Sequence, residues 1–210
     1  MKTKEFIITS IFIVFCLFLY WLFPVQDNFQ KVVTLLVFFV FLPIFFLKII
    51  LKKPILTSLG IRKGDFNQGI KWSIFSLAAS GALLWLLVVY TNFLKEYYLP
   101  RDVAADFWSF LFFELGMVLF LVFVYEVFFR GFVFFRLESK LGYWAIAVQF
   151  AIFLVFVLTA NSSIWLFAPY LVFAPFAGII ACKSRSILYS GLSQMLLFII
   201  FDANIVRLIK

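Results

Sequence analysis

Tyr125-Glu126-Val127-Phe128-Phe129-Arg130-Gly131 is the most informative polar pattern in this chain. Glu126 and Arg130 are four residues apart, so they share one face of a helix. They lie in a run from Phe107 to about Phe135 that has no proline and only one other charged residue, Glu114. A helix of that length is roughly 40 Å long, more than the ~30 Å hydrocarbon core of a bilayer. The run predicts a membrane helix that tilts, breaks or carries its last turns, including Glu126 and Arg130, to the interface.

The composition extends this interpretation to the whole chain. Of its 210 residues, 66% are hydrophobic and 13% are charged, whereas soluble proteins are about 45–50% apolar and about 25% charged. The net charge of +8 does not indicate nucleic-acid binding, because the basic residues lie in short loops between apolar runs. We expect one transmembrane domain over residues 1–210, surrounded by membrane lipids and with no nucleic-acid partner. The phenylalanine and isoleucine bias hints at a bacterial source.

Seven segments are long enough, or nearly so, to cross a bilayer, which takes about 20 apolar residues. They are about Phe6–Pro24, Val32–Leu51, Ile70–Thr91, Phe107–Phe135, Tyr143–Ala160, Ile164–Cys182 and a last segment that begins near Ile187. The sequence predicts an all-α polytopic transmembrane helix bundle of about seven spans, within a range of six to eight. The excess of Lys and Arg in alternate connectors predicts a cytoplasmic N-terminus, so we expect a multi-pass protein of the cell membrane.

The isolated polar residues in the apolar segments have simple structural interpretations. Gln149, Gln194 and Asn204 are typical of residues that hydrogen-bond across membrane helices. Asp202 lies close to the C-terminal end, and we expect it to be solvated.

The acidic residues of the long fourth segment differ in their expected settings. Glu114 lies twelve residues before Glu126, which turns it about 120° away on a straight α-helix. We therefore expect Glu114 on another face, partly solvated. Glu126 and Arg130 have a purely structural alternative, a self-neutralising ion pair near the interface. Gly131 suits a close approach by another backbone.

Four pieces of the sequence resemble the CPBP family, the CAAX-protease and bacteriocin-processing membrane proteins that are also called Abi proteins. Glu126-Val127-Phe128-Phe129-Arg130-Gly131-Phe132 resembles its first motif, Glu-Glu-x-x-x-Arg followed by glycine. The other three are Leu141-Gly142-Tyr143-Trp144-Ala145-Ile146, Arg185-Ser186-Ile187-Leu188 and the upstream Ser58-Leu59-Gly60-Ile61-Arg62. The resemblance covers roughly residues 55–200 and implies the helical core of an intramembrane endopeptidase.

The resemblance also indicates where this chain departs from the family's catalytic residues. Tyr125 stands at the position of the first glutamate, so only Glu126 remains of that pair. The second motif, Phe-x-x-x-His, maps onto residues 153–157 and places Val157 at the histidine position. The third motif places Gln194 at its histidine and Phe198 at its asparagine.

These departures bear on the chemistry that the resemblance implies. In the family, a glutamate is thought to activate a water molecule, and histidines to bind a metal or stabilise the oxyanion. A catalytic zinc ion usually takes three protein ligands, and this chain has no histidine. The sequence therefore does not support a family-type zinc cofactor, and we expect no cofactor.

Three hypotheses for the function follow. The first is a catalytically degraded family member that serves as a scaffold, an immunity protein or a partner-binding protein. In it, Glu126 and Arg130 act as a clasp, and a cavity between the fourth to seventh spans binds a partner's transmembrane helix, a lipidated peptide or a lipid. The alternative is an active CAAX-type endopeptidase with Glu126 as general base, worth about 10²–10⁴-fold alone, and with Tyr125 and Gln194 as oxyanion donors. A small transporter is the third, and the clustering of the intramembrane charges near one end of one helix argues against it.

Overall fold

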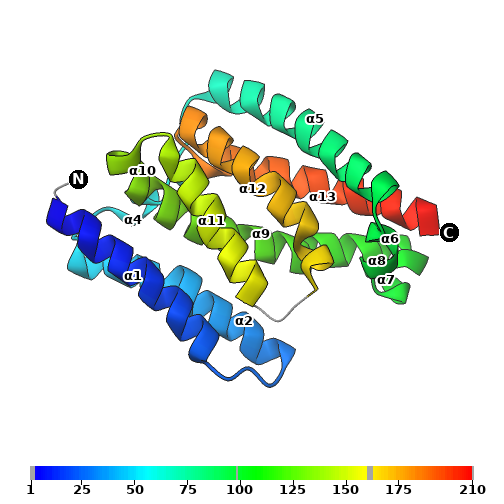
Figure 1. Cartoon of the computed structure of the whole chain (residues 1–210), viewed down its shortest axis with the longest axis horizontal. Helices are drawn as coiled ribbons and strands as arrows, with labels where there is room; N and C mark the ends of the chain where they lie inside the picture. Colours follow the sequence, from blue (N-terminus) through cyan, green and yellow to red (C-terminus); the bar gives the residue numbers. More distant parts are fainter. Residues whose placement is uncertain (1–2, 98, 160–162, 210) are drawn as a thin grey trace.

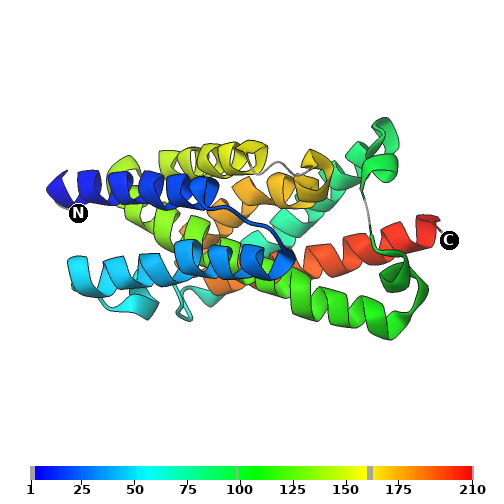
Figure 2. The same cartoon turned by 90° about the horizontal axis from the view of Figure 1, so that it is seen from below.

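The computed structural model describes residues 3–97, 99–159 and 163–209, and the regular elements within these ranges are all helical. Seven helical spans lie side by side, with the two termini at opposite ends of the long axis (Figures 1 and 2). The spans are α1 (Thr3–Leu22); α2 (Asn28–Leu36) with η1 (Val37–Phe41), α3 (Leu42–Phe45) and η2 (Phe46–Ile50); α5 (Phe66–Tyr90); α8 (Phe107–Phe112) with η3 (Phe113–Val118), α9 (Leu119–Tyr125), η4 (Glu126–Phe134) and α10 (Phe135–Leu141); α11 (Trp144–Thr159); α12 (Ile164–Ser184); and α13 (Ile187–Ile209). Short helices in the connectors are α4 (Ile55–Ser58), α6 (Phe93–Glu96) and α7 (Arg101–Ala105).

Each of the seven predicted segments is occupied by a helical span. Six of the spans in the described ranges are long and apolar enough to cross a membrane by length and composition, and α11 is apolar but shorter. With 16 residues, α11 is roughly 24 Å long at the rise of an α-helix, less than the ~30 Å hydrocarbon core. The prediction of an all-α, multi-pass membrane bundle is confirmed.

The fourth span differs from the prediction in its length and winding. It runs from Phe107 to Leu141 as one helical stretch of 35 residues, so Glu126 and Arg130 lie inside it rather than in its last turns. Two of its segments, η3 and η4, have π-helical hydrogen bonding. The second begins at Glu126 and contains Arg130. π-helical turns are rare and frequently occur at functional sites.

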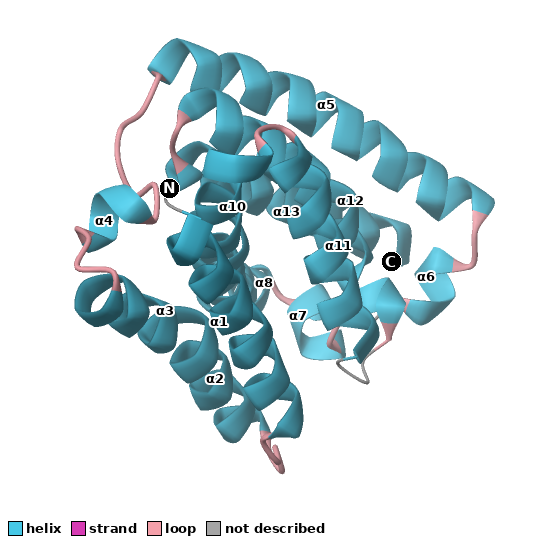
Figure 3. Ribbon diagram, turned by 60° about the vertical axis from the view of Figure 1, so that its left-hand side comes forward, coloured by secondary structure: helices cyan, strands magenta, loops and turns pink. Residues whose placement is uncertain are grey.

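The helix α12 is the centre of the packing. It contacts α5 on one side and α11 and α13 on others, and α13 in turn contacts η3, α9 and η4. The α1 hairpin with the second span lies across the bundle from α5 (Figures 1 and 3).

Small residues bring these helices close together. The buried positions of α5 include Ser73, Ser76 and Ser80, which form the kind of small-residue surface that membrane helices use for tight packing. At Gly178 of α12, a Cβ atom would lie 3.0 Å from Cγ2 of Ile146. These small residues therefore allow α5 and α11 to pack closely against α12.

Candidate functional site

The Glu126–Arg130 pair is buried at the junction of four spans. Arg130 is completely buried and Glu126 is 3% exposed, with Arg130 Nε 3.4 Å from Glu126 Oε1. Ser190 of α13 donates its hydroxyl hydrogen to Glu126 Oε2 at 2.5 Å. Arg130 Nη2 donates to the carbonyl oxygen of Ala174 on α12 at 3.4 Å, and its guanidinium carbon is 5.7 Å from the ring centroid of Phe153 on α11. The pair thus connects η4 to α11, α12 and α13.

Gly131 allows the connector before α5 to cross the fourth span. A Cβ atom at Gly131 would lie 2.8 Å from the carbonyl oxygen of Leu59, which is too short for any real contact. One turn further along the fourth span, Arg136 Nη2 donates to the carbonyl oxygen of Ser58, and the two atoms are 3.2 Å apart. The close backbone approach predicted at Gly131 is confirmed.

The position of the missing glutamate is filled by an aromatic ring. Tyr125 is buried, and its ring packs edge-on against those of Phe129, Phe153, Phe156 and Tyr170. The centroid distances are 5.7 Å to Phe153, 5.8 Å to Phe156 and 5.6 Å to Tyr170. Edge-to-face packing at such distances is favourable between aromatic side chains. The surroundings of this position are therefore apolar rather than arranged to bind a polar reactant.

The positions of the missing histidines and asparagine are also buried. Val157 lies one turn beyond Phe153 on α11. On α13, Gln194 lies one turn beyond Ser190, and Phe198 follows one turn later. The ring of Phe198 is 4.4 Å, between centroids, from that of Tyr170.

The prediction that three amides link helices is not borne out by the described residues. Neither the oxygen nor the nitrogen of the Gln149 and Gln194 side chains finds a hydrogen-bond partner there. Asn204 is exposed, and its amide nitrogen donates to the carbonyl of Ile200 in its own helix at 2.7 Å. Gln149 and Gln194 are held by packing, since both are completely buried.

Glu114 and Asp202 form a second buried polar cluster, and the prediction that both are solvated is wrong. Glu114 is completely buried and Asp202 is 3% exposed. Asp202 is the acidic neighbour of Glu114, and the hydroxyl of Tyr97 donates to Asp202 Oδ1 at 2.8 Å. Burial, and next the Asp202 carboxylate, raise the pKa of the Tyr97 hydroxyl above its ordinary value, so Tyr97 remains a donor.

Ionisable residues inside the membrane spans therefore occur at two places, at Glu126–Arg130 and at Glu114–Asp202. The prediction that they cluster at one end of one helix is wrong, and so is the argument against a transporter that was based on it.

Glu114 and Glu126 of the fourth span both face α13. Glu126 meets Ser190, and Glu114 faces Asp202, so the partners are twelve residues apart on each of two antiparallel helices. The π-helical η3 and η4 wind less tightly than an α-helix. The 120° separation expected for a straight α-helix therefore does not apply.

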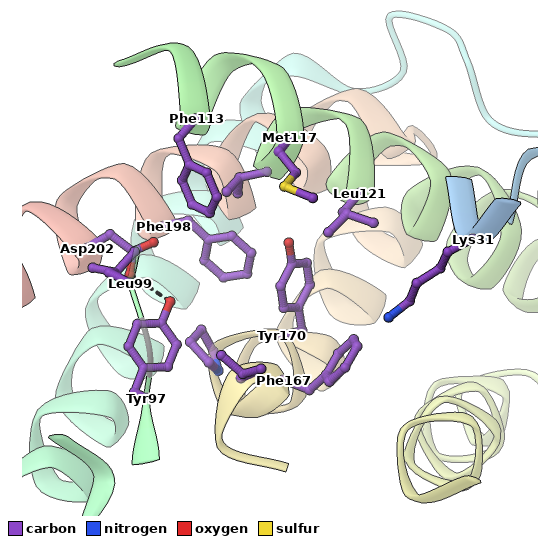
Figure 4. Close-up of a pocket in the computed structure, with 13 residues that line it drawn as sticks. Lys31, Tyr97, Leu99, Phe113, Met117, Leu121, Phe167, Tyr170, Phe198 and Asp202 are labelled. Carbon is purple, nitrogen blue, oxygen red and sulfur yellow. Dashed lines mark hydrogen bonds between the residues drawn. The ribbon is translucent and has the colours of Figure 1, made fainter. Parts of the chain in front are cut away.

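A cavity of about 200 Å³ adjoins the Glu114–Asp202 cluster (Figure 4). Its walls come from the fourth span, α12, α13, the connector after α6 and Lys31 of α2, and they are mostly apolar. Phe198 and Tyr170 line it, and Figure 4 shows the Tyr170 hydroxyl pointing into the open space beside Met117. The predicted cavity is thus present between the fourth, sixth and seventh spans, but α11 contributes no wall, and Glu126 does not line it.

The comparison with known proteins supports the motif interpretation. Residues 106–200 match the Rce1-like family of type II CAAX prenyl endopeptidases. This Rce1-like segment begins at the residue that caps α8 and ends two residues before Asp202, and it contains Glu126 and Arg130. No curated protein and no solved structure matches the chain. The resemblance to the CAAX-protease family is confirmed over the Rce1-like segment.

The residues around Glu126 do not fit the metal ion that the family resemblance implies. No group of three or more His, Cys, Asp or Glu side chains comes together within the described ranges. The polar neighbours of Glu126 are the Arg130 guanidinium and the Ser190 hydroxyl. A zinc site takes three nitrogen, sulfur or carboxylate ligands, and an adjacent guanidinium opposes a second cation. The Rce1-like segment therefore offers no donor set for metal-assisted hydrolysis.

The sequence does not predict a role for Ser190, Tyr97 or Tyr170 in these sites. For Ser190 the spacing offers a clue, because this residue lies one turn before Gln194 on the same helix face. Tyr97 and Tyr170 had none, because they are tyrosines among many aromatic residues, and their roles depend on the packing of α12 and of the connector after α6.

Proposed function

We propose that this protein is a catalytically degraded CAAX-protease-like membrane protein that binds a lipidated peptide in the cavity beside Phe198. One observation carries the proposal: the surviving motif carboxylate does not line the cavity. Glu126 is ion-paired with Arg130 and hydrogen-bonded by Ser190, while Phe198 and Tyr170 line the cavity. A general base must reach the proton that it removes, and this arrangement favours binding over hydrolysis.

The residues that replace the family's catalytic residues also favour binding over hydrolysis. Phe198 stands where the resemblance places an asparagine, and Tyr125 stands where it places a glutamate. Their rings meet Tyr170 at 4.4 Å and 5.6 Å between centroids. Aromatic walls suit an apolar chain, with a few polar groups left to set its orientation.

The proposal places the protein in the cell membrane with a cytoplasmic N-terminus, as the distribution of basic residues predicts. Glu126 and Arg130 then serve as a structural clasp. The role of a scaffold or of an immunity protein agrees with a cavity that binds a ligand and with a Glu126 carboxylate that does not reach it.

Binding without cleavage is the expected result when purified protein in nanodiscs meets a farnesylated CAAX-type peptide carrying a fluorophore. Fluorescence anisotropy measures binding, and chromatography of the peptide measures cleavage. Phe198→Trp should weaken binding at least about tenfold, because the indole occupies part of the cavity. Leu192→Trp on the lipid-facing side of α13, where Leu192 is 71% exposed, is the matched control and should bind normally.

Two outcomes contradict the proposal. The first is cleavage by the wild type that disappears in Glu126→Gln while that variant retains its melting temperature, which would establish the endopeptidase alternative. The second is a peptide that fails to bind, or that binds equally to Phe198→Trp.

A further inference from the structure

The acidic end of the cavity is not explained by the family motif. Asp202 lies beyond the Rce1-like segment, and Glu114 lies within it but outside the motif. Asp202 lines the cavity together with Tyr97 and Tyr170. These side chains come from different elements, the fourth span, α12, α13 and the connector after α6, so the tertiary fold creates this cluster.

The two acids of the cluster have no cationic partner among the described residues, and the Tyr97 hydroxyl donates to Asp202. Glu114 is completely buried, its carboxyl group neighbours that of Asp202, and no donor from any other described residue reaches its oxygens. The ion pairs found in those ranges join Lys53 to Glu5, Arg130 to Glu126 and Arg185 to Glu138, so they include neither acid of the cluster. A buried pair of carboxyl groups without a counter-charge is costly inside a membrane protein, and ionisable residues at such positions usually indicate function.

Tyr170 gives an independent indication of a ligand. Its side chain is only 8% exposed, yet its hydroxyl points into the cavity, and no hydrogen bond joins it to the other lining residues drawn in Figure 4. The Tyr170 hydroxyl and the Asp202 carboxylate thus both line the cavity, whereas Glu114, the neighbour of Asp202, does not line it.

The chemistry of these groups selects the kind of ligand. The Asp202 carboxylate and the Tyr170 phenol oxygen can together accept several hydrogen bonds, and an alkylammonium group supplies up to three donors with a positive charge. The aromatic rings beside the acids also attract cations. Lys31, on the opposite side of the cavity in Figure 4, leaves the acidic end free. A divalent metal ion suits the cluster less, because no third carboxylate, His or Cys joins it within the described ranges.

We propose that Asp202 and Tyr170, with the negative charge of the adjacent Glu114–Asp202 pair, bind the ammonium group of an amphiphilic amine whose apolar chain occupies the cavity. The inference rests on the proposed function only in that both use this cavity for a ligand. The amine has two possible sources, a membrane aminophospholipid and a free long-chain amine, and both present the same ammonium group.

The test uses a dodecylamine with a photoreactive diazirine on its chain, added to the protein in phosphatidylcholine nanodiscs. After irradiation, mass spectrometry measures the labelling of the peptides that contain Met117 and Phe198. Asp202→Asn should reduce amine labelling about tenfold at limiting probe, because it removes a charge-assisted hydrogen bond. Glu114→Gln should reduce it less, because Glu114 acts on the ammonium group only through its neighbour Asp202. Tyr170→Phe, which keeps the ring, should reduce it less. Glu96→Gln, an exposed acid near Tyr97, is the matched control.

A dodecanol probe with the same diazirine separates head-group recognition from partition of the chain. It should label the cavity peptides weakly and equally in the wild type and in Asp202→Asn. Competition by phosphatidylethanolamine identifies the lipid source, and competition by unlabelled dodecylamine alone identifies a free amine. Amine labelling that is unchanged in Asp202→Asn and Glu114→Gln, or dodecanol labelling as strong as amine labelling, overturns the inference.

The two proposals fail separately. Binding of the farnesylated peptide with no amine selectivity removes only the inference about the ammonium site. Amine selectivity with no peptide binding removes only the proposed function. Melting temperatures of all variants identify those that are misfolded, and Tyr170→Phe keeps the inference testable if a carboxyl variant unfolds.

Discussion

Replacing Arg130 with leucine is expected to destabilise the bundle by about 3–5 kcal/mol, because it leaves the Glu126 carboxylate buried without a counter-charge. The same change removes the hydrogen bond to the carbonyl of Ala174 and the contact with the ring of Phe153. Equilibrium unfolding in mixed micelles measures the loss. Arg207→Leu, at an exposed arginine of α13, is the control and should change stability little.

A double variant separates the cost of an unpaired charge from the cost of lost packing. Glu126→Leu combined with Arg130→Leu should recover most of the stability lost in Arg130→Leu, since replacing both members of a buried pair by apolar residues is often neutral or stabilising. Unchanged stability in Arg130→Leu alone would show that the pair does not act as a clasp. A double variant as unstable as the single one would show that packing, and not charge, sets the cost.

Gly131→Ala is expected to destabilise the protein by about 1–3 kcal/mol, the usual cost of extra volume in a well-packed site. The new Cβ atom would lie 2.8 Å from the carbonyl oxygen of Leu59, so the connector or the helix must shift. Thermal unfolding followed by circular dichroism measures the effect.

Gly116→Ala in the same span is its matched control. A Cβ atom at Gly116 would meet nothing within 4 Å, and alanine is favoured over glycine in a helix by about 1 kcal/mol. This variant should therefore be as stable as the wild type or more so. Equal effects of the two changes would mean that the contact with Leu59 does not control the position of the fourth span.

The helical architecture could be predicted from the sequence because it depends on local properties. Each apolar run is bounded by polar connectors, and the length of a run is enough to identify a membrane helix. Glu126 and Arg130 could be placed together for the same reason, since four residues bring two side chains onto one helix face. The close approach at Gly131 follows from the absence of a side chain.

The acidic cluster could not be predicted, because its formation depends on geometry that the sequence does not display. The face of the fourth span on which Glu114 lies depends on the π-helical turns of η3 and η4. The 3.6-residue period of a regular α-helix therefore places Glu114 on a different face from Glu126, which is wrong. Asp202 was expected to be solvated because it lies near the end of the chain, but the connector that carries Tyr97 covers it. The partners expected for Gln149 and Gln194 were not found, since burial in a membrane helix does not by itself bring a donor to an acceptor.

The antiparallel pairing of the fourth span with α13 has a mechanical consequence. Ser190 and Asp202 are twelve residues apart on α13, roughly 18 Å along its axis, and each is in register with one carboxyl group of the fourth span. A small axial slide of α13 therefore changes both contacts at once, in the manner of shear between packed helices. A molecule that binds Asp202 and shifts α13 along its axis would also strain the hydrogen bond between Ser190 and Glu126. Through α13, binding at one contact would therefore alter the other.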